Sequence, residues 1–434
     1  MSLYGALSIG VAGLDAASAA LSVSSSNIAN VNTIGYKEAT ASFSTYLDAS
    51  LGSQSNASAG VTAVIGQEVT KNGLAESTSS PTDLSISGNG FFITTPSGSA
   101  TGAQEYTQVG NFTADAKGDL VNANGQYLLG WALDTNGNPP SNNTDLSLIN
   151  VSGISGSAQA TSTVSLQANL QANSTIDASY NPGDMTAGNA TPDFQTTINA
   201  YDSQGGVQPI TLSFVQTGTN QWAYEIDYAG DPNNLSSPNP IGEGTLSFNS
   251  DGSLANVNGA SPASGDISVT IPWSGTSGLS SQTINFNMGT VGSTNGVTQF
   301  AANSAVSGQS VNGSPFGSVT GVTVDSKGIV TAQFSNGIST KVYQIPIATF
   351  ANPDGLIQVS GGAYLQSSTS GGANINQAGS GGAGTIASNS LEESTVDLSS
   401  EFTKLITAQN AYSAAARVVS TANQMLQALE QIPA

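Results

Sequence analysis

Apolar residues recur at every seventh position near both ends of this chain and at every second position between the ends. The row near the N-terminus consists of Leu7, Leu14, Leu21 and Ile28. The row near the C-terminus consists of Leu398, Leu405, Tyr412, Val419 and Leu426. A seven-residue repeat indicates helices that pack along one seam, whereas a two-residue alternation indicates strands. The chain is therefore expected to be helical at its two ends and β-rich in between.

The N-terminal helical segment carries almost no charge. Asp15 is the only charged residue among the first 36, although a solvated helix normally places Glu and Lys on its outer face. Two interpretations stay open at this point: ordinary amphipathic helices on a globular domain, or helices that become ordered only when many copies assemble. The scarcity of charge favours the second, because such a helix is marginal in water when it is alone.

Strand-like alternation fills the middle of the chain. Trp222, Tyr224, Ile226 and Tyr228 alternate in this way, and turn pairs such as Asp251-Gly252 separate such runs. Asn-Gly and Asp-Gly pairs accept the positive φ of tight hairpin turns, so antiparallel sheets in sandwiches or open barrels are expected. Gly- and Ser-rich stretches at 49–60 and 370–390 have the composition of linkers.

These patterns predict an α+β, multidomain fold. The two heptad helices would form a coiled-coil-like inner domain, and antiparallel β domains would be nested between them. The expected division is a helical domain at 1–36 and 391–434, linkers at 37–71 and 366–390, a discontinuous first β domain at 72–155 and 300–365, and an inserted outer β domain at 156–299.

Charge and composition exclude several classes of function. The chain has 28 acidic residues against 7 Lys and Arg, a net charge of -21, which disfavours nucleic acids and anionic membrane surfaces as partners. It has no Cys and no His, which excludes Cys/His zinc sites, disulfides and every Ser-His or Cys-His catalytic pair. No Lys or Arg lies between 118 and 326, and this anionic block is interpreted as a solubilising surface rather than a ligand site.

We expect no catalytic, cofactor or metal site. The segment from Asp134 to Asn138 resembles the opening of a calcium loop, but the pattern requires Gly at the sixth position and Glu at the twelfth, and neither is present, so a turn is expected. Glu392 and Glu393 suit the positive end of a helix dipole. No apolar run is expected to approach the length of a membrane span, and no cleaved signal peptide is recognisable.

Four segments resemble signatures of the bacterial flagellar rod and hook proteins. The first runs from 24 to 37 and contains Asn27, Asn30, Asn32, Gly35 and Tyr36. The others are 81–92 with its continuations at 106–112 and 118–121, then 351–356, then 391–412. Thr395 stands where the family usually has Asn. The resemblance covers both ends and most of 72–130, and the segment 156–299 is similar to the insertion of the longer hook members rather than to the shorter rod members.

The resemblance implies a structural subunit of the flagellar hook and no enzyme. Such subunits form a helical homopolymer, a flexible tubular universal joint that transmits torque from motor to filament. It implies export by the flagellar type III apparatus without a cleaved signal peptide and an extracellular location in the hook and basal body. The implied neighbours are rod, hook cap and hook–filament junction proteins, with no nucleic acid and no membrane insertion.

Residue roles follow from the same resemblance. The two apolar rows would be polymer interface positions, or else simply intrachain core. Asn27, Asn30 and Asn32 would be cap and turn residues, or else interface contacts. Two other functions stay open: a distal rod subunit or other axial protein, and a secreted acidic β-rich adhesin or glycan-binding protein, whose stalk would normally lie at one end only.

Overall fold

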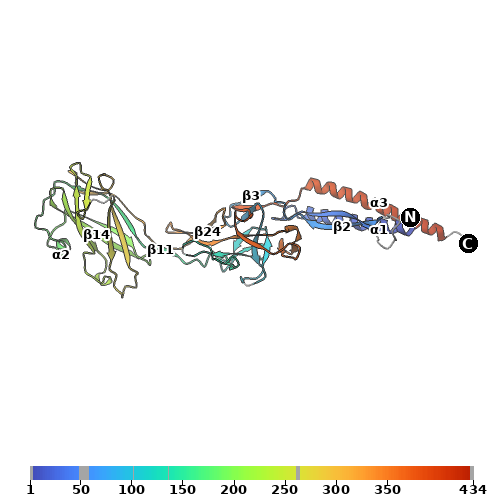
Figure 1. Ribbon diagram of the computed structural model, residues 1–434, viewed down its shortest axis with the longest axis horizontal. Coiled ribbons are helices and arrows are strands. Elements are labelled where there is room, and N and C mark those ends of the chain that lie inside the picture. Colours follow the sequence, from blue (N-terminus) through green and yellow to red (C-terminus); the bar gives the residue numbers. More distant parts are fainter. Residues whose placement is uncertain (1–2, 48–57, 101, 135, 261–263, 431–434) are drawn as a thin grey trace. The chain divides into compact units, whose positions relative to one another are not determined.

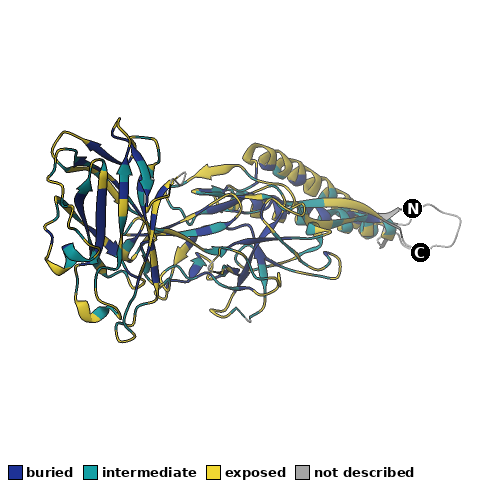
Figure 2. Ribbon diagram, turned by 60° about the vertical axis from the view of Figure 1, so that its left-hand side comes forward, coloured by how far each residue is buried: buried dark blue, intermediate teal, exposed yellow. Residues whose placement is uncertain are grey.

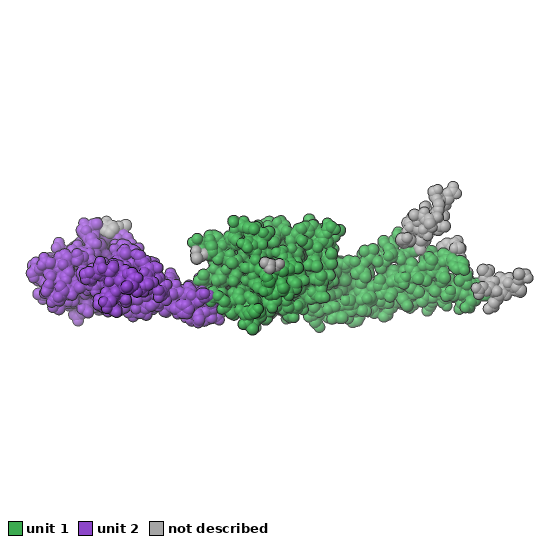
Figure 3. Space-filling view, turned by 90° about the horizontal axis from the view of Figure 1, so that it is seen from below, with its two compact units in different colours: residues 1–154, 321–332, 340–434 green, residues 155–320, 333–339 purple. Residues whose placement is uncertain are grey.

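The computed structural model describes residues 3–47, 58–100, 102–134, 136–260 and 264–430. The chain divides into two compact units, which Figure 3 colours separately. Unit 1 contains residues 1–154, 321–332 and 340–434, and unit 2 contains residues 155–320 and 333–339. The chain thus leaves unit 1, forms unit 2 and returns. Three strands have residues in both units: β23 (Val319–Val324), β24 (Ile329–Phe334) and β25 (Ser339–Gln344).

The helical part of unit 1 consists of α1 (Leu3–Ala29), α3 (Leu398–Glu430) and a hairpin of β1 (Ala39–Leu47) and β2 (Ser58–Gln67). These elements lie side by side although α1 and α3 are at opposite ends of the sequence (Figure 1). The carboxylate of Asp397 accepts a 2.9 Å hydrogen bond from the backbone N–H of Ser400, which makes Asp397 the N-cap of α3. The C-terminal helix therefore begins later than the predicted boundary at 391. Glu392 and Glu393 precede it and do not complement its dipole.

The apolar character of α1 is greater than the sequence interpretation assumed. By length and composition alone, Tyr4–Ala29 would suffice to cross a membrane. The expectation that no segment approaches a membrane span is therefore wrong for this helix, because its Ala, Val and Leu outweigh the interspersed Ser in mean hydropathy. In the structure α1 packs against α3 and both hairpin strands, which cover part of its apolar surface and leave Tyr4 and Val11 exposed.

An antiparallel sheet forms the β part of unit 1. Its main path runs β23-β24-β25-β9-β5-β6-β28-β27. The strands not yet named are β5 (Phe91–Thr95), β6 (Glu105–Thr107), β7 (Phe112–Ala114), β8 (Leu120–Asn122), β9 (Tyr127–Ala132), β10 (Ser147–Leu148), β26 (Pro346–Thr349), β27 (Ile357–Val359), β28 (Ala363–Leu365) and β29 (Asn374–Gln377). Leu84, Phe92 and Phe112 are fully buried in one of its cores, and Ile93 and Trp131 lie in a second.

Two short strand pairs join the N-terminal and C-terminal halves of unit 1. β3 (Ala75–Ser77) pairs with β31 (Ser390–Glu392), and β4 (Leu84–Ser87) pairs with β30 (Thr385–Ser388). A single-turn 3-10 helix, η2 (Pro353–Gly355), lies between β26 and β27. The resemblance at 81–92 thus falls on strands β4 and β5 of this unit.

The segments expected to be linkers contain strands. In 37–71, β1 and β2 occupy most of the described residues. The Gly/Ser stretch at 49–60 lies largely outside the residues that the structure describes. In 366–390, β29 pairs with β26 and β30 pairs with β4. Gly379, Gly381 and Gly382 have φ values of +78°, +60° and +83°. The glycines there serve a tight turn, which composition alone does not distinguish from a flexible linker.

Unit 2 is a sandwich of two sheets around one buried core. One sheet contains β18 (Ser264–Ile271), β19 (Gln282–Thr290), β12 (Thr163–Gln171), β20 (Val297–Phe300) and β21 (Ala305–Val311). The other contains β13 (Phe194–Tyr201), β14 (Val207–Gly218), β15 (Gln221–Tyr228), β16 (Gly242–Phe248) and β17 (Leu254–Val257). The remaining elements are β11 (Ser157–Gln159) paired with β22 (Ser314–Gly317), α2 (Asp184–Ala187) and η1 (Pro232–Asn234).

The alternation in β15 is confirmed. Trp222, Tyr224, Ile226 and Tyr228 are all buried in the sandwich core or at its edge. The predicted insertion ended at 299, whereas unit 2 also contains β21 and β22. Both strands pair with strands that begin the unit, which sequence reading did not reveal.

Candidate self-association site

Small residues form the contact between α1 and α3. A Cβ atom placed on Gly13 would lie 3.4 Å from Cβ of Ala415, and one placed on Gly10 would lie 2.8 Å from Cγ2 of Val419. The order of these contacts shows that the helices are antiparallel. Gly and Ala allow their backbones to approach closely. The described buried residues of the two helices are, apart from Val23, correspondingly small or polar: Gly10, Ala16, Ala17, Ser24, Asn27, Glu401, Ala408 and Ala422.

The structure brings the predicted apolar rows together only in part. Leu14 and Val419 line one cavity between the helices. Both are half-buried, as are Leu7, Leu21, Ile28, Leu405 and Leu426. Leu398 and Tyr412 are 40% and 42% exposed. Every seventh residue of a straight α-helix is rotated by ~20° from the last, so a heptad row gradually leaves the contact face.

Sequence reasoning looked for large side chains and therefore missed the small residues that make the contact. The signal was present in α1, where Gly or Ala occupies positions 10, 13, 16, 17 and 20. These positions recur at intervals of three and four, the spacing of one helix face. A search for small residues at this spacing would have found the face that meets α3.

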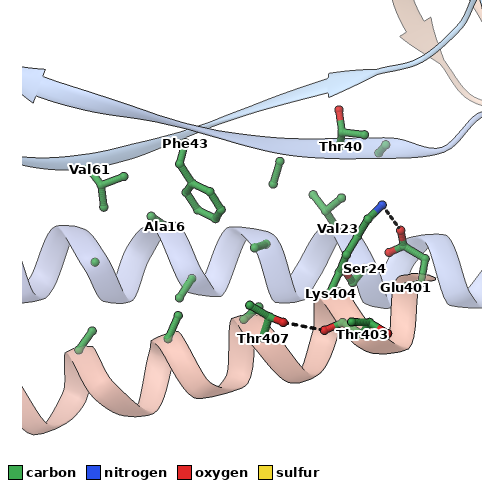
Figure 4. A pocket seen from close by; sticks show the side chains of 18 residues that line it. Ala16, Val23, Ser24, Thr40, Phe43, Val61, Glu401, Thr403, Lys404 and Thr407 are labelled. Atoms are coloured by element: carbon green, nitrogen blue, oxygen red, sulfur yellow. Dashed lines mark hydrogen bonds and ion pairs between the residues drawn. The ribbon is translucent and has the colours of Figure 1, made fainter. Parts of the chain in front are cut away.

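A cavity of about 590 Å³ lies between α1, α3 and the β1–β2 hairpin (Figure 4). Its wall is mainly apolar and includes Ala16, Val23, Phe43 and Val61. Phe43 is 57% exposed although it lines the cavity. The helices and hairpin of one chain therefore do not fill the space that they enclose.

Large apolar side chains also lie on the outer surfaces of these elements. On α3, Phe402, Ile406 and Met425 are 52%, 57% and 55% exposed. On β2, Val64 and Ile65 are 57% and 58% exposed. Figure 2 shows that most of α3 is exposed, with buried positions along one face only. Exposed apolar surface of this kind is typical of sites that contact other proteins or membranes.

A polar cluster, here called the junction, joins the helices to the sheets; it comprises Asn27, Tyr36, Lys37, Glu38, Lys71, Glu392, Thr395, Glu401 and Lys404. Asn27 holds the chain where α1 passes into β1. Its amide Nδ2 donates to the Ala39 carbonyl at 2.8 Å, and its Oδ1 accepts from the Ala39 N–H at 3.0 Å and from the Tyr36 hydroxyl at 3.1 Å. Asn27 lies inside the helix and is buried, so it joins two elements rather than capping one.

The other signature residues around Asn27 have different roles. Gly35 has φ +66°, and a Cβ there would lie 3.1 Å from Cγ2 of Val109, so this position requires glycine. Its N–H donates to the Glu392 carbonyl at 2.8 Å. Asn30 donates to the Ser26 carbonyl at 2.9 Å, as expected of a turn residue, and Asn32 is exposed.

Lys37 and Glu392 form a buried ion pair across the two ends of the chain. Lys37 Nζ lies 2.8 Å from Glu392 Oε1 and donates to the Lys71 carbonyl at 2.7 Å. Glu392 Oε1 also accepts from the Gly73 N–H at 2.6 Å. Burial lowers the pKa of Lys37 from its ordinary value, and the charge and hydrogen bond of Glu392 oppose that shift only in part.

Glu38 forms the second half of the junction. Its carboxylate lies 3.0 Å from Lys71 Nζ and 2.5 Å from Lys404 Nζ, and Lys404 also contacts Glu401 at 2.7 Å. Burial alone would raise the pKa of Glu38, but the two lysines outweigh it and lower that pKa. The Glu38 N–H donates to Thr395 Oγ1 at 2.9 Å. Within the described residues every ion pair lies in the junction, so the paired charges are found where α1, α3 and the sheets meet.

Unit 2 brings carboxylates together that sequence reasoning kept apart. Glu225 lies directly opposite Glu243 in the sheet, and the Thr186 hydroxyl is 2.6 Å from both Glu225 and Asp227. Burial raises the pKa of Asp227. Both oxygens of Glu225 are occupied by donors from Thr186, the Met185 N–H and the Tyr180 hydroxyl, which orient α2 against the sheet. This arrangement is structural.

The described residues of the calcium-like segment, 134 and 136–138, are held by turn-type hydrogen bonds. The Asp134 carboxylate accepts hydrogen bonds from the backbone N–H groups of Asn136 at 2.9 Å and Asn138 at 2.8 Å. These bonds lower the pKa of Asp134. Among the described residues, no group of three or more Asp or Glu is placed to hold a metal ion.

Family models match four stretches of the chain in order. They are described as "Flagella basal body rod protein" for residues 7–37, "Flagellar hook protein FlgE/F/G D1 domain" for 85–170, "Flagellar basal body protein FlaE D2 domain" for 169–314 and "Flagellar basal body rod FlgEFG protein C-terminal" for 387–432. The helical ends, the unit 1 sheet and the unit 2 sandwich thus each have a counterpart.

Whole-length relatives agree with these matches. The chain is 31% identical to the flagellar hook protein FlgE of Caulobacter vibrioides, with 100% of both chains covered, and 34% identical to that of Rhizobium meliloti, with 99% of both covered. A solved structure of the Helicobacter pylori flagellar hook protein FlgE2 is 15% identical with a TM-score of 0.44 and covers 73% of this chain and 100% of its own.

Proposed function

The chain belongs to the family of flagellar hook proteins FlgE, and from this premise we propose that it is a structural subunit of the bacterial flagellar hook that polymerises with copies of itself. The similarity extends over 99–100% of the chain and of the relatives named above. The observation that carries the proposal within the structure is the uncovered apolar surface of α1, α3 and the hairpin, which a single chain leaves exposed. The full-length relatives are hook proteins, so the comparisons do not favour the two alternative functions for this chain, a rod subunit or an adhesin.

In the proposed polymer, the terminal helices form a coiled-coil-like inner tube around a channel. The residues we assign to contacts between copies are the two rows: Leu7, Leu14, Leu21, Ile28, Leu398, Leu405, Tyr412, Val419 and Leu426. Seven of them are half-buried, and Leu398 and Tyr412 are exposed, which supports this role because all nine keep surface available after α1 and α3 have packed together. The cavity beside the hairpin supplies further unfilled apolar surface.

The junction suits the transmission of torque. It joins α1, β1, β31 and α3 through a buried Lys37–Glu392 pair and the Glu38 ion pairs. Force applied to the inner helices would therefore reach the sheets through short, buried contacts. The segment 366–390 was expected to be a linker but contains strands, so we do not assign the flexibility of the universal joint to it. We assign that flexibility to sliding between outer domains of neighbouring copies.

Location and partners follow as further parts of the proposal. The subunit acts in the hook and basal body, outside the cell, after export by the flagellar type III apparatus without a cleaved signal peptide. Its neighbours are rod, hook cap and hook–filament junction proteins. Helix α1 is rich in small residues and carries little charge, so its stability comes mainly from packing. This property suits export of the chain in an unfolded state.

Leu14→Asp and Leu405→Asp test the interface assignment. Each places a charge on a half-buried row position and is expected to block tube formation, seen by electron microscopy, while far-UV circular dichroism of the sheets is unchanged. Ile357→Asp is the matched control, because Ile357 is 54% exposed on β27, outside the helical part. Normal tubes from either row variant would contradict the assignment.

A further inference from the structure

Outside the junction, α1 and α3 each carry one charged residue among those whose side chains the structure describes. Asp15 is the only charged residue of α1, and Arg417 is the only charged residue between 405 and 429. Both side chains are exposed. Within the described part of the chain neither side chain makes an ion pair, because all such pairs lie in the junction. Lys404, the other cation on α3, is already held by Glu38 and Glu401.

The two charges point to opposite sides of the helical pair. Residues two positions apart in an α-helix are separated by ~200° around its axis. Asp15 is two residues from Gly13 and from Ala17, so it lies on the side of α1 opposite the face that meets α3. Arg417 is likewise two residues from Ala415 and from Val419, which meet α1. Asp15 and Arg417 of one chain are therefore separated by both helices and have no route to each other.

Each charge lies within a stripe of exposed, otherwise uncharged residues. The α1 stripe is spaced by fours and threes and contains Tyr4, Ser8, Val11, Asp15, Ser18 and Ser22. The α3 stripe contains Phe402, Ile406, Ser413, Arg417 and Gln424. Tyr4 and Val11 are 72% and 44% exposed. One stripe thus offers an acid among apolar and hydroxyl groups, and the other offers a base among apolar, hydroxyl and amide groups.

We propose that Asp15 of one copy forms an ion pair with Arg417 of the next copy in the tube, so that the α1 stripe of one subunit docks on the α3 stripe of its neighbour. This inference rests on the proposed function, because it names the residues that set the contact between copies. The two stripes lie on opposite sides, so the contact is heterologous and leaves a free stripe at each end of the assembly. Val11 lies one helical turn from Asp15 and would help to exclude water from the pair, which strengthens it relative to an exposed ion pair.

Reciprocal charge exchange tests the pair in the full-length chain. Asp15→Arg, Arg417→Asp and the double variant are purified, and the critical concentration for tube formation is measured by sedimentation and electron microscopy. Each single reversal sets like charges against each other and is expected to raise the critical concentration by about tenfold or more. The double variant restores opposite charges and is expected to return to within about threefold of the unaltered chain. Added salt should narrow the differences, because it screens charges.

Matched controls separate this contact from net charge. Asp145→Arg and Lys341→Asp make the same charge changes at exposed positions of the unit 1 sheet region, and they should leave the critical concentration unchanged. Normal assembly of the single variants would overturn the pairing, and so would a double variant that remains as impaired as the singles. In either case tubes of the unaltered chain would still support the proposed function. Failure of the unaltered chain to form tubes would contradict the proposed function itself.

Discussion

Replacing Gly10 by Ala should weaken the contact between α1 and α3, whereas replacing Gly13 by Ala should strengthen it. The new methyl group at position 10 would lie 2.8 Å from Cγ2 of Val419, closer than carbon atoms approach in proteins. The methyl group at position 13 would lie 3.4 Å from Cβ of Ala415, which is an ordinary contact. The two changes are otherwise alike, since both add one methyl group to the same helix.

The magnitude follows from two opposing terms. Ala is favoured over Gly inside a helix by about 1 kcal/mol, and this gain is common to both variants. Overpacking at position 10 costs about 1–3 kcal/mol, because β-branched Val419 cannot easily rotate away. Gly10→Ala is therefore expected to be ~0–2 kcal/mol less stable than the unaltered chain, and Gly13→Ala ~1 kcal/mol more stable.

Hydrogen exchange of the α3 backbone in assembled tubes measures this difference as a free energy of local opening. The double variant Gly10→Ala/Val419→Ala is the control, because it removes the atom that the new methyl group meets, and it should recover protection relative to Gly10→Ala. Equal protection in Gly10→Ala and Gly13→Ala would refute the close approach of the helices at Gly10.

Other predictions concern the junction. Lys37→Met should destabilise unit 1 by about 3–5 kcal/mol in urea unfolding, because it leaves the buried Glu392 carboxylate without its cation. The double variant Lys37→Met/Glu392→Gln should recover most of that lost stability. A double variant as unstable as the single variant would argue against the ion pair. The lowered pKa of Glu38 means that its stabilising contribution is present above its ordinary pKa and is lost as pH falls through the lower value in the folded protein. Thermal stability should therefore fall below about pH 4, and this fall should be smaller in Glu38→Gln; an identical acid dependence in both would exclude Glu38 as its source.

Sequence patterns predicted the helices at both ends and the strands with strict alternation. The burial of Trp222, Tyr224 and Ile226 in β15 shows why, since one face of that strand meets a core and the period of two is imposed by it. The same reasoning failed at 366–390, where Gly and Ser frequencies indicated a linker. There the pairing of β30 with β4 joins residues about 300 positions apart, and local composition does not report such pairing.

The candidate site was predictable in its location but less so in its detail. The apolar rows identified the correct helices, yet the contact face is made by Gly10, Gly13 and Ala415, whose small size conveys little hydrophobic signal. The junction was harder still, because Lys37 and Glu392 are 355 positions apart in the sequence. Only the fold brings such residues together.

The central claim is that the terminal helices of one chain are completed by neighbouring copies. Hydrogen exchange of residues 3–29 and 398–430, compared between dilute monomer and assembled tubes, tests it directly. Amides of the exposed faces should exchange rapidly in the monomer and become strongly protected in tubes, while the sheets of both units keep the same protection. Equal and strong protection of both helices in the monomer and in the tube would contradict the claim.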